Sequence, residues 1–338
     1  MSPTPHTWLD LLTQAIAQQA SDLHLSAGLT PRVRVHGQLI PLRSNVTEPL
    51  THETLLALLA ELMDDTHHAQ LQQGHEVDFA FAAPGLGRFR ANAFLQQHGV
   101  STVMRHIPDH TPTLAALQTP AVLTDLLKQV GLLLVTGPTG SGKSTTLAAM
   151  VQHLNTHTRQ HLVTLEDPIE FVHASDQCVI TQREIGTHSR GFAQALRATL
   201  REDPDVILVG ELRDLETIRL ALTAAETGHL VLASLHTRSA PATIDRMVDV
   251  FDAHEKALVR TQLSEALVGV LSQTLCPTPS DTGRAAVFET LVATPAIRHL
   301  IREGKTAQMH SVLQTSAALG MQTLQQALQH ARAEGRIA

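Results

Sequence analysis

Residues 131–155 read GLLLVTGPTGSGKSTTLAAMVQHLN, and this stretch decides which fold the chain can adopt. Residues 132–135 form an apolar run with the length of a buried strand, and apolar residues recur at helical spacing after residue 143. Between them, residues 137–144 fit the pattern GxxxxGKS/T. Glycines let backbone N–H groups turn inward around phosphate oxygens, and the lysine brings a positive charge to the outer phosphates. The stretch therefore predicts a strand, a phosphate-binding loop and a helix.

The predicted loop offers both backbone and side-chain groups to a nucleotide. The helix that follows points the positive end of its dipole at the same anion. The hydroxyl of Ser144 is placed to ligate Mg²⁺, which prefers oxygen ligands. The predicted nucleotide-binding residues are Gly137, Pro138, Thr139, Gly140, Ser141, Gly142, Lys143, Ser144 and Thr145.

Short apolar runs continue to alternate with helical segments beyond this loop. Near-continuous apolar strands that alternate with helices are typical of a parallel sheet covered on both faces. We therefore expect an α/β domain over residues 121–338, with a mainly helical part after about residue 250. The runs are residues 132–135, 162–165, 206–209 and 230–235, and helices are expected at about 143–155, 189–201 and 214–227.

The region before residue 106 has a different pattern, which predicts a smaller α+β domain over residues 1–106. Three prolines within residues 108–120 resist both helix and sheet, so we expect a linker at about 107–120. In the smaller domain, helices are expected at about 8–20 and 52–63, and strands at 32–36, 77–82, 87–94 and 102–106.

Two of the predicted parallel strands end in acidic residues, Glu166 and Glu211. Ligands of open α/β sheets bind at the carboxyl ends of the strands, and a carboxylate after a buried strand is costly unless it has a polar role. We expect Glu211 to orient and deprotonate an attacking water. Because Gly210 stands where an acidic residue often precedes such a base, Mg²⁺ is expected to rely on Ser144, with Glu166 and Glu211 acting through water. The alternative for both acids is a solvated strand end.

Two histidines, His229 and His236, bracket the run at residues 230–235. Such residues can sense the outermost phosphate of a nucleotide and transmit its presence to a subunit face. A lone histidine at a strand end is more often structural, so this alternative stays open.

The composition excludes several classes of protein. The net charge of −7 and the 3% content of aromatic residues argue against a general nucleic-acid coat and against stacking on single strands. Only two cysteines are present, which gives neither a disulfide framework nor a zinc knuckle. No signal peptide is evident, and no apolar run reaches the ~18 residues that a membrane-spanning helix needs. We therefore expect a cytoplasmic protein without direct membrane insertion.

Several stretches together resemble PilT-type retraction ATPases of type IV pili, within the secretion ATPase superfamily. The resemblance covers about residues 8–337, and its longest stretch is highly specific. The stretches are ASDLHLSAG (20–28), GPTGSGKST (137–145), VTLEDPIEF (163–171), ALRATLREDPDVILVGELRDLETIRLALTAAETGHLV (195–231), SLHT (234–237) and TPAIRHLIREGK (294–305).

The resemblance implies a homohexamer of two-domain subunits, with a PAS-like N-terminal domain and a RecA-like C-terminal domain. It implies ATP and Mg²⁺ as ligands, and ATP hydrolysis coupled to pilus retraction and twitching motility. The implied partners are an inner-membrane pilus platform protein and, indirectly, pilin, with no nucleic acid. The implied location is the cytoplasmic side of the inner membrane, reached through the pilus machine.

The resemblance also implies roles for individual residues. Residues 137–145 match the Walker A loop, Glu166 lies in the Asp box and Glu211 is the Walker B glutamate. His229 and His236 fall in the His box. Arg90 and Arg105 match arginines that close over the nucleotide, where such a charge speeds phosphoryl transfer by ~10³–10⁵-fold. A motif tied to retraction matches Ala296, Ile297, Arg298, His299, Leu300, Ile301, Arg302 and Glu303.

Two positions depart from the expected pattern, since His98 replaces an arginine and Phe288 replaces a histidine. Three functions therefore remain open: a retraction motor, an assembly or secretion ATPase, and an accessory nucleotide-gated paralogue that acts as a scaffold for a second motor. Assembly ATPases commonly carry a four-cysteine zinc insertion, which this chain lacks. A scaffold without turnover is expected to have lost Lys143 or Glu211, and both are present.

Overall fold

The computed structural model describes residues 7–35, 37–44, 46–107, 111–280 and 283–338, which fall into two compact units. The first unit is Met1–His110 and the second is Thr111–Ala338. The linker expected at 107–120 lies partly outside the described residues, because 108–110 are not among them. The last residue of the strand expected at 32–36 also lies outside them.

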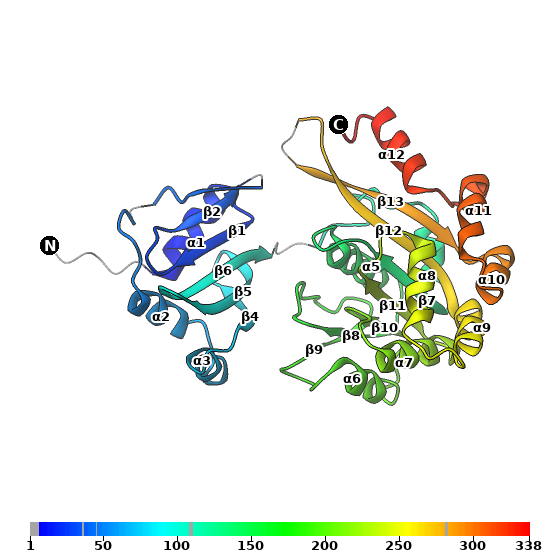
Figure 1. Cartoon of the computed structure of the whole chain (residues 1–338), viewed down its shortest axis with the longest axis horizontal. Coiled ribbons are helices and arrows are strands. Elements are labelled where there is room, and N and C mark those ends of the chain that lie inside the picture. Colours follow the sequence, from blue (N-terminus) through cyan, green and yellow to red (C-terminus); the bar gives the residue numbers. More distant parts are fainter. Residues whose placement is uncertain (1–6, 36, 45, 108–110, 281–282) are drawn as a thin grey trace. The chain divides into compact units, whose positions relative to one another are not determined.

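The first unit is a six-stranded antiparallel sheet with helices on one face (Figure 1). The strand order is β3-β2-β1-β6-β5-β4. Buried side chains such as Leu23 and Met104 pack with Leu12 and Leu55 of the helices. The elements are α1 (Trp8–Ala17), β1 (Asp22–Ser26), β2 (Arg32–Val35), β3 (Gln38–Pro41), α2 (His52–Ala60), α3 (Asp65–Gln72), β4 (Val77–Ala83), β5 (Gly87–Gln96) and β6 (Gly99–Ile107).

Capping residues explain where the helices of this unit begin. Thr7 and Asp10 form a capping box at α1, and the side chain of Thr51 accepts a hydrogen bond from Thr54 N at α2. The sequence did not predict β3 or α3. In β3 no residue is buried, and in α3 only Leu71 is buried, so neither has the apolar periodicity that marks an element.

The second unit is a seven-stranded sheet in the order β13-β12-β7-β11-β10-β8-β9. All neighbouring strands are parallel except the pair β12 and β13, so the predicted parallel arrangement of the four apolar runs is confirmed. The elements are α4 (Leu123–Leu126), β7 (Gly131–Thr136), α5 (Lys143–His157), β8 (His161–Glu166), β9 (Val179–Glu184), α6 (Phe192–Thr199), β10 (Val206–Val209), α7 (Leu215–Glu226), β11 (Leu230–Leu235), α8 (Ala240–Asp249), α9 (Lys256–Ala266), β12 (Leu267–Pro277), β13 (Arg284–Val292), α10 (Pro295–Arg302), α11 (Met309–Thr315) and α12 (Leu324–Ala333).

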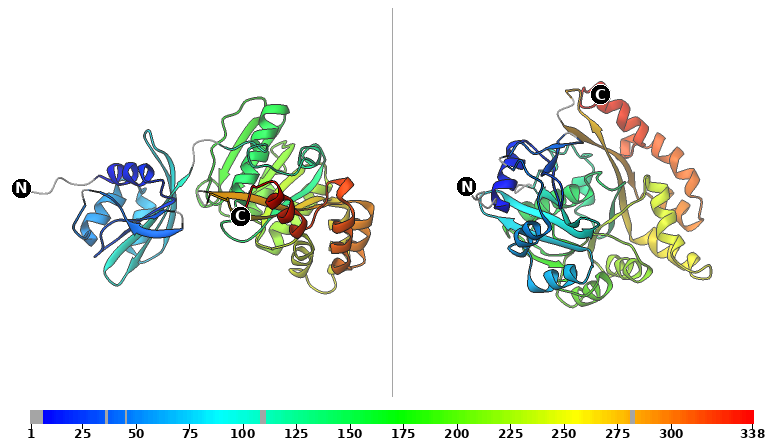
Figure 2. Two further views of the ribbon diagram at one scale, coloured as in Figure 1. Left: turned by 90° about the horizontal axis from the view of Figure 1, so that it is seen from above. Right: turned by 60° about the vertical axis from the view of Figure 1, so that its left-hand side comes forward.

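Helices cover both faces of this sheet, as the unbroken apolar runs require (Figures 1 and 2). Alternate residues of β7 face opposite ways, so Leu132 packs with α6 to α9 whereas Leu133 packs with α4 and α5. Among the described residues, every side chain of β7 is buried. The carboxyl end of this central strand leads directly into the predicted phosphate-binding loop.

The part after residue 250 is less helical than expected. β12 adds to the sheet beside β7, and β13 returns antiparallel to it, with α12 packed along β13 (Figure 1). Residues 267–273 are buried on both faces of the sheet, so their sequence lacks the polar alternation that would have marked a strand. No helix in the described part of the chain is long and apolar enough to cross a membrane.

Candidate nucleotide site

The loop between β7 and α5 has a backbone shape that only glycines allow. Gly137, Gly140 and Gly142 have φ angles of 149°, 77° and 86°. A Cβ atom at Gly137 would lie 2.3 Å from the carbonyl oxygen of Gln273. The loop is therefore shaped by close approach of backbone to β12, and it ends at the N-terminus of α5, where backbone N–H groups lack intrahelical partners.

The polar groups in this loop fit a phosphate. Lys143 Nζ donates to the carbonyl oxygens of Gly137 and Pro138 at 2.9 and 3.2 Å. Burial lowers the pKa of Lys143, although the charges of Glu211 and Glu170 oppose this. Ser141 Oγ is buried and has no hydrogen-bond partner among the described residues. A buried hydroxyl without a partner beside a buried ammonium group is a feature that an anionic ligand would complete.

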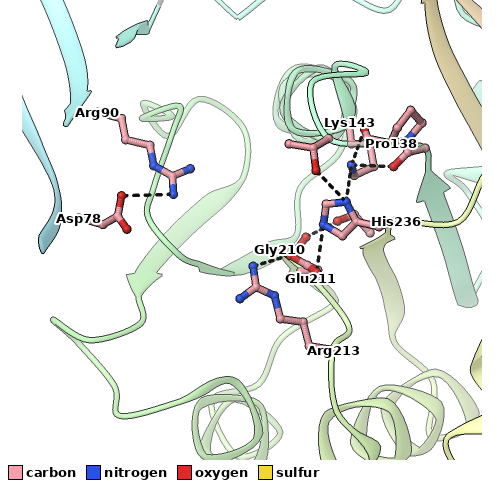
Figure 3. A network of polar contacts seen from close by, with 11 residues as sticks. Asp78, Arg90, Pro138, Lys143, Gly210, Glu211, Arg213 and His236 are labelled. Atoms are coloured by element: carbon pink, nitrogen blue, oxygen red, sulfur yellow. Dashed lines mark hydrogen bonds and ion pairs between the residues drawn. The ribbon is translucent and has the colours of Figure 1, made fainter. Parts of the chain in front are cut away.

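Glu211 follows β10 and contacts the side chains of Arg213 and His236 (Figure 3). Its Oε2 lies 2.8 Å from Arg213 Nη2, and its Oε1 lies 3.1 Å from His236 Nε2. Burial by itself would raise the pKa of Glu211, but the hydrogen bonds and charges of Arg213 and His236 outweigh it, so the pKa is lowered. Glu211 is therefore held ionised, which is the state that a general base requires.

His236 connects this carboxylate to the phosphate-binding loop. Its Nδ1 lies 3.4 Å from Thr139 Oγ1 and 3.5 Å from Lys143 Nζ, while its Nε2 contacts Glu211 (Figure 3). The residue follows β11 at the same edge of the sheet as the loop. A group bound in the loop and the carboxylate of Glu211 would thus both lie within reach of one imidazole ring.

Glu166 ends β8, the strand next to β10, in surroundings unlike those of Glu211. Its Oε1 accepts hydrogen bonds from Thr164 Oγ1 at 2.7 Å and from Gln182 Nε2 at 3.2 Å. Burial raises the pKa of Glu166, although these hydrogen bonds act in the opposite direction. The exposed hydroxyl of Ser144, with the carboxylates of Glu211 and Glu166, offers the hard oxygen donors that suit Mg²⁺.

The structure does not bring His229 to this site. His229 precedes β11, and its backbone oxygen accepts from Gly131 N at the start of β7, so it lies at the amino edge of the sheet. A strand of six residues spans roughly 20 Å, which separates it from His236. Its Nδ1 pairs with Ala224 O at 2.9 Å. Within one chain, His229 and His236 therefore lie at opposite ends of β11, and a role of His229 toward a nucleotide stays a prediction.

Arg90 and Arg105 lie in the first unit, directly opposite each other on β5 and β6. Arg105 Nε donates to Oδ1 of the buried Asp22 at 2.8 Å. Arg90 Nη2 lies 3.8 Å from Asp78 Oδ1 (Figure 3). Both arginines therefore stand on the face of the sheet away from the helices, beside carboxylates that orient them. Their role toward a nucleotide stays a prediction.

The predicted retraction motif forms α10 and its cap. Thr294 caps the helix, and Ile297, Leu300 and Ile301 are buried, whereas Ala296 and His299 are exposed. Arg298 donates to the backbone oxygens of Ser264 and Glu265 at the end of α9. Arg302 Nη1 lies 3.1 Å from Glu265 Oε1, and the exposed Glu303 ends the helix. Both arginines thus contact the end of α9, although Arg302 remains exposed.

The two unexpected residues occupy different surroundings. Phe288 is buried in the core below α5, and its backbone oxygen accepts from Gln322 Nε2 at 3.0 Å. His98 is exposed in the turn between β5 and β6. A phenyl ring suits the apolar position of Phe288 without a polar partner.

Sequence reasoning missed three residues near the site. Arg213 holds Glu211, the charge of Glu170 acts on Lys143, and Gln182 contacts Glu166. The position of Arg213, two residues after Glu211, was a signal that could have found it. Gln182 carried no such signal, because its strand β9 was itself not predicted.

Known proteins resemble the chain over nearly its whole length. The family model described as type II/IV secretion system protein matches residues 2–337. The type IV pilus retraction ATPase PilT of Pseudomonas aeruginosa is 53% identical over 97% of this chain and 94% of its own length. A twitching motility protein of Neisseria gonorrhoeae is 50% identical over 98% of this chain and 88% of its own length.

A solved structure gives the same result for the fold. The crystal structure of the pilus retraction motor PilT with bound ADP has a TM-score of 0.90 and 43% sequence identity, and the match covers 98% of this chain and 95% of that chain. The resemblance expected from the sequence and the α/β fold class with a RecA-like domain are confirmed.

Proposed function

The chain belongs to the family of type II/IV secretion system proteins, and from this premise we propose that it is an ATPase that drives retraction of type IV pili. One observation carries the proposal: His236 contacts both Lys143 and Glu211 beside a glycine-shaped loop at the carboxyl edge of the sheet. The relatives named as a retraction ATPase and a twitching motility protein support the biological role.

The phosphates of ATP bind in the glycine-shaped loop at the N-terminus of α5. Lys143 then exchanges the carbonyl oxygens of Gly137 and Pro138 for phosphate oxygens, which are stronger acceptors because they are charged. Ser144 would hold Mg²⁺, with Glu166 and Glu211 acting through water, and the ion would neutralise charge on the outer phosphates.

Glu211 orients the attacking water and accepts its proton. Its lowered pKa keeps the carboxylate ionised, and the contact with His236 fixes the direction of Oε1. Removing a base of this kind typically costs ~10²–10⁴ in rate. Because His236 also lies beside Lys143, a change at the phosphates reaches Glu211 through one side chain.

The assembly and its partners are part of the same proposal. Six copies form a ring, each with a PAS-like domain over 1–106, a linker over 107–120 and a RecA-like domain over 121–338. Arg90 and Arg105 close over the nucleotide and stabilise the charge that develops during hydrolysis. The ring acts on an inner-membrane platform protein from the cytoplasmic side, and pilin is moved indirectly.

The test combines ATPase activity with pilus counts. The purified protein is expected to hydrolyse ATP with Mg²⁺ present, and Lys143→Ala is expected to abolish turnover while Lys128→Ala, at an exposed surface lysine, leaves it unchanged. Cells that lack the protein are expected to carry more surface pili that do not retract. Unchanged pili would instead indicate an accessory paralogue, and fewer pili would indicate an assembly ATPase.

A further inference from the structure

The side-chain amide of Gln182 on β9 makes three hydrogen bonds that nothing in the proposed chemistry uses. Its Nε2 donates to Glu166 Oε1 at 3.2 Å and to the backbone oxygen of Phe171 at 2.8 Å. Its Oε1 accepts from the backbone N of His173 at 2.8 Å. A single amide thus joins the acidic end of β8 to the segment that follows it in the chain.

That segment, residues 167–178, connects β8 to β9. Glu184, two residues after Gln182 on the same face of β9, accepts from the backbone N of Ile169 at 2.9 Å. In β8 the residues beside Gln182 and Glu184 are Thr164 and Glu166. Side chains of β9 therefore fix the first half of the segment through hydrogen bonds to its backbone.

The second half of the segment is held from α5, the helix that begins at Lys143. Asn155, which is buried, donates to Ala174 O at 2.8 Å and accepts from Asp176 N at 3.0 Å. Within the half held by β9, Glu170 lies between the attached residues Ile169 and Phe171, and its charge acts on both Glu166 and Lys143. The position of the segment thus sets where negative charge stands relative to the phosphate-binding loop.

We propose that Gln182 is a positioning residue for ATP hydrolysis, which fixes the Glu166 carboxyl group and the segment carrying Glu170 beside the phosphate-binding loop. This inference rests on the proposed ATPase function. Among the described residues, the side-chain hydrogen bonds of Gln182 reach Glu166, Phe171 and His173 and none of the residues of the phosphate-binding loop. It acts through Glu166, on whose Oε1 its amide and the hydroxyl of Thr164 converge.

The first test replaces Gln182 by Met, which keeps the length and removes all three hydrogen bonds. We expect kcat to fall about 10–100-fold, because misplacement of a group at the site by about 1 Å costs this much. The KM for ATP should change less than about threefold, since the phosphate-binding loop is intact. Gln177→Met is the matched control, because Gln177 lies in the same segment and its side chain makes one hydrogen bond among the described residues, to Thr156 O. A kcat for Gln182→Met within twofold of the wild type would overturn the proposal.

A double-mutant cycle with Thr164→Val separates positioning from general loss of packing. Both side chains donate to the same oxygen of Glu166, so the double variant is expected to lose no more activity than the worse single variant. Multiplying losses would mean that the two side chains act independently, which contradicts a shared action through Glu166.

Hydrogen exchange gives a readout that needs no ATP. In Gln182→Met the amides of residues 169–175 are expected to exchange faster than in the wild type, with an unchanged unfolding midpoint. Gln182→Glu retains the acceptor for His173 N and loses the donor to Glu166. This variant should therefore keep the backbone amide of His173 protected from exchange and still lower kcat. Unchanged exchange in Gln182→Met would refute the role of Gln182 in fixing residues 169–175. A wild-type protein without ATPase activity would refute the proposed function instead, and the exchange result would still decide whether Gln182 fixes this segment.

Discussion

Glu166 ends β8 and Glu211 follows the neighbouring strand β10, yet they stand in opposite electrostatic surroundings. Glu211 faces Arg213 and His236, and its pKa is lowered. Glu166 is held by the neutral side chains of Thr164 and Gln182, and burial raises its pKa. Two carboxyl groups whose environments separate their pKa values are suited to different tasks. We infer that Glu211 serves as the base while Glu166 organises the segment around the metal and the phosphates.

The largest effect is expected when the base is removed. Glu211→Gln keeps the shape of the side chain and removes its ability to accept a proton, so kcat should fall ~10²–10⁴-fold. Steady-state ATPase assays measure the fall in kcat. Glu216→Gln is the control, because Glu216 is an exposed residue of α7 that pairs with Arg197 of α6. A variant that turns over as fast as the wild type would mean that Glu211 is not the base.

A smaller effect is expected from His236→Ala. This change removes the group that lies between Glu211, Thr139 and Lys143. A hydrogen bond to a charged group is worth about 1.5–3 kcal/mol, which corresponds to a loss in kcat of about 10–100-fold. Parallel assays of His299→Ala, at an exposed histidine on α10, give the background for loss of an imidazole. Equal ATPase activity of the two variants would mean that His236 has no specific role in ATP hydrolysis.

These two strand ends also show what the sequence could and could not predict. The loop at residues 137–145 and the acids Glu166 and Glu211 were predictable, because glycine spacing and strand-end carboxylates are local signals. The edge at which His229 lies depends on the direction of β11, which places it roughly 20 Å from His236. Strand β12 was missed because its first half is buried on both faces.

Arg213→Ala tests whether the lowered pKa of Glu211 depends on its cation. The arginine stabilises the ionised carboxylate, so its removal raises the pKa of Glu211. A base works only above its pKa, and the acid limb of the kcat profile should therefore shift to higher pH. Because the arginine is mostly exposed, pairs of this kind are worth about 0.2–1 kcal/mol, and kcat at pH 8 should fall less than about fivefold. A profile that keeps its acid limb would contradict the pairing.

The smallest effect is the pH dependence of stability, and its sign should differ between the two acids. The pKa of Glu166 is raised above its ordinary 4.5, so the stability that this group contributes is present below 4.5 and is lost as the pH rises through the raised pKa. The unfolding midpoint of Glu166→Gln relative to wild type should therefore increase with pH.

Glu211 should behave in the opposite way. Its pKa is lowered below 4.5, so its contribution is present above 4.5 and is lost as the pH falls through the lowered pKa. The midpoint of Glu211→Gln relative to wild type should decrease as the pH rises. Thermal unfolding between about pH 3 and pH 8 measures both slopes, with the Glu211 slope below pH 4.5 and the Glu166 slope above it, and slopes of the same sign would contradict the difference between the two sites.

The most direct measurement identifies the nucleotide that each variant retains after incubation with ATP and Mg²⁺. Glu211→Gln and Glu166→Gln are passed rapidly through a desalting column, denatured, and analysed for ATP and ADP. We expect Glu211→Gln to retain unhydrolysed ATP, because its phosphate-binding loop is intact and its base is missing. We expect Glu166→Gln to contain ADP. ADP in Glu211→Gln, formed as fast as in the wild type, would contradict the assignment of Glu211 as the base.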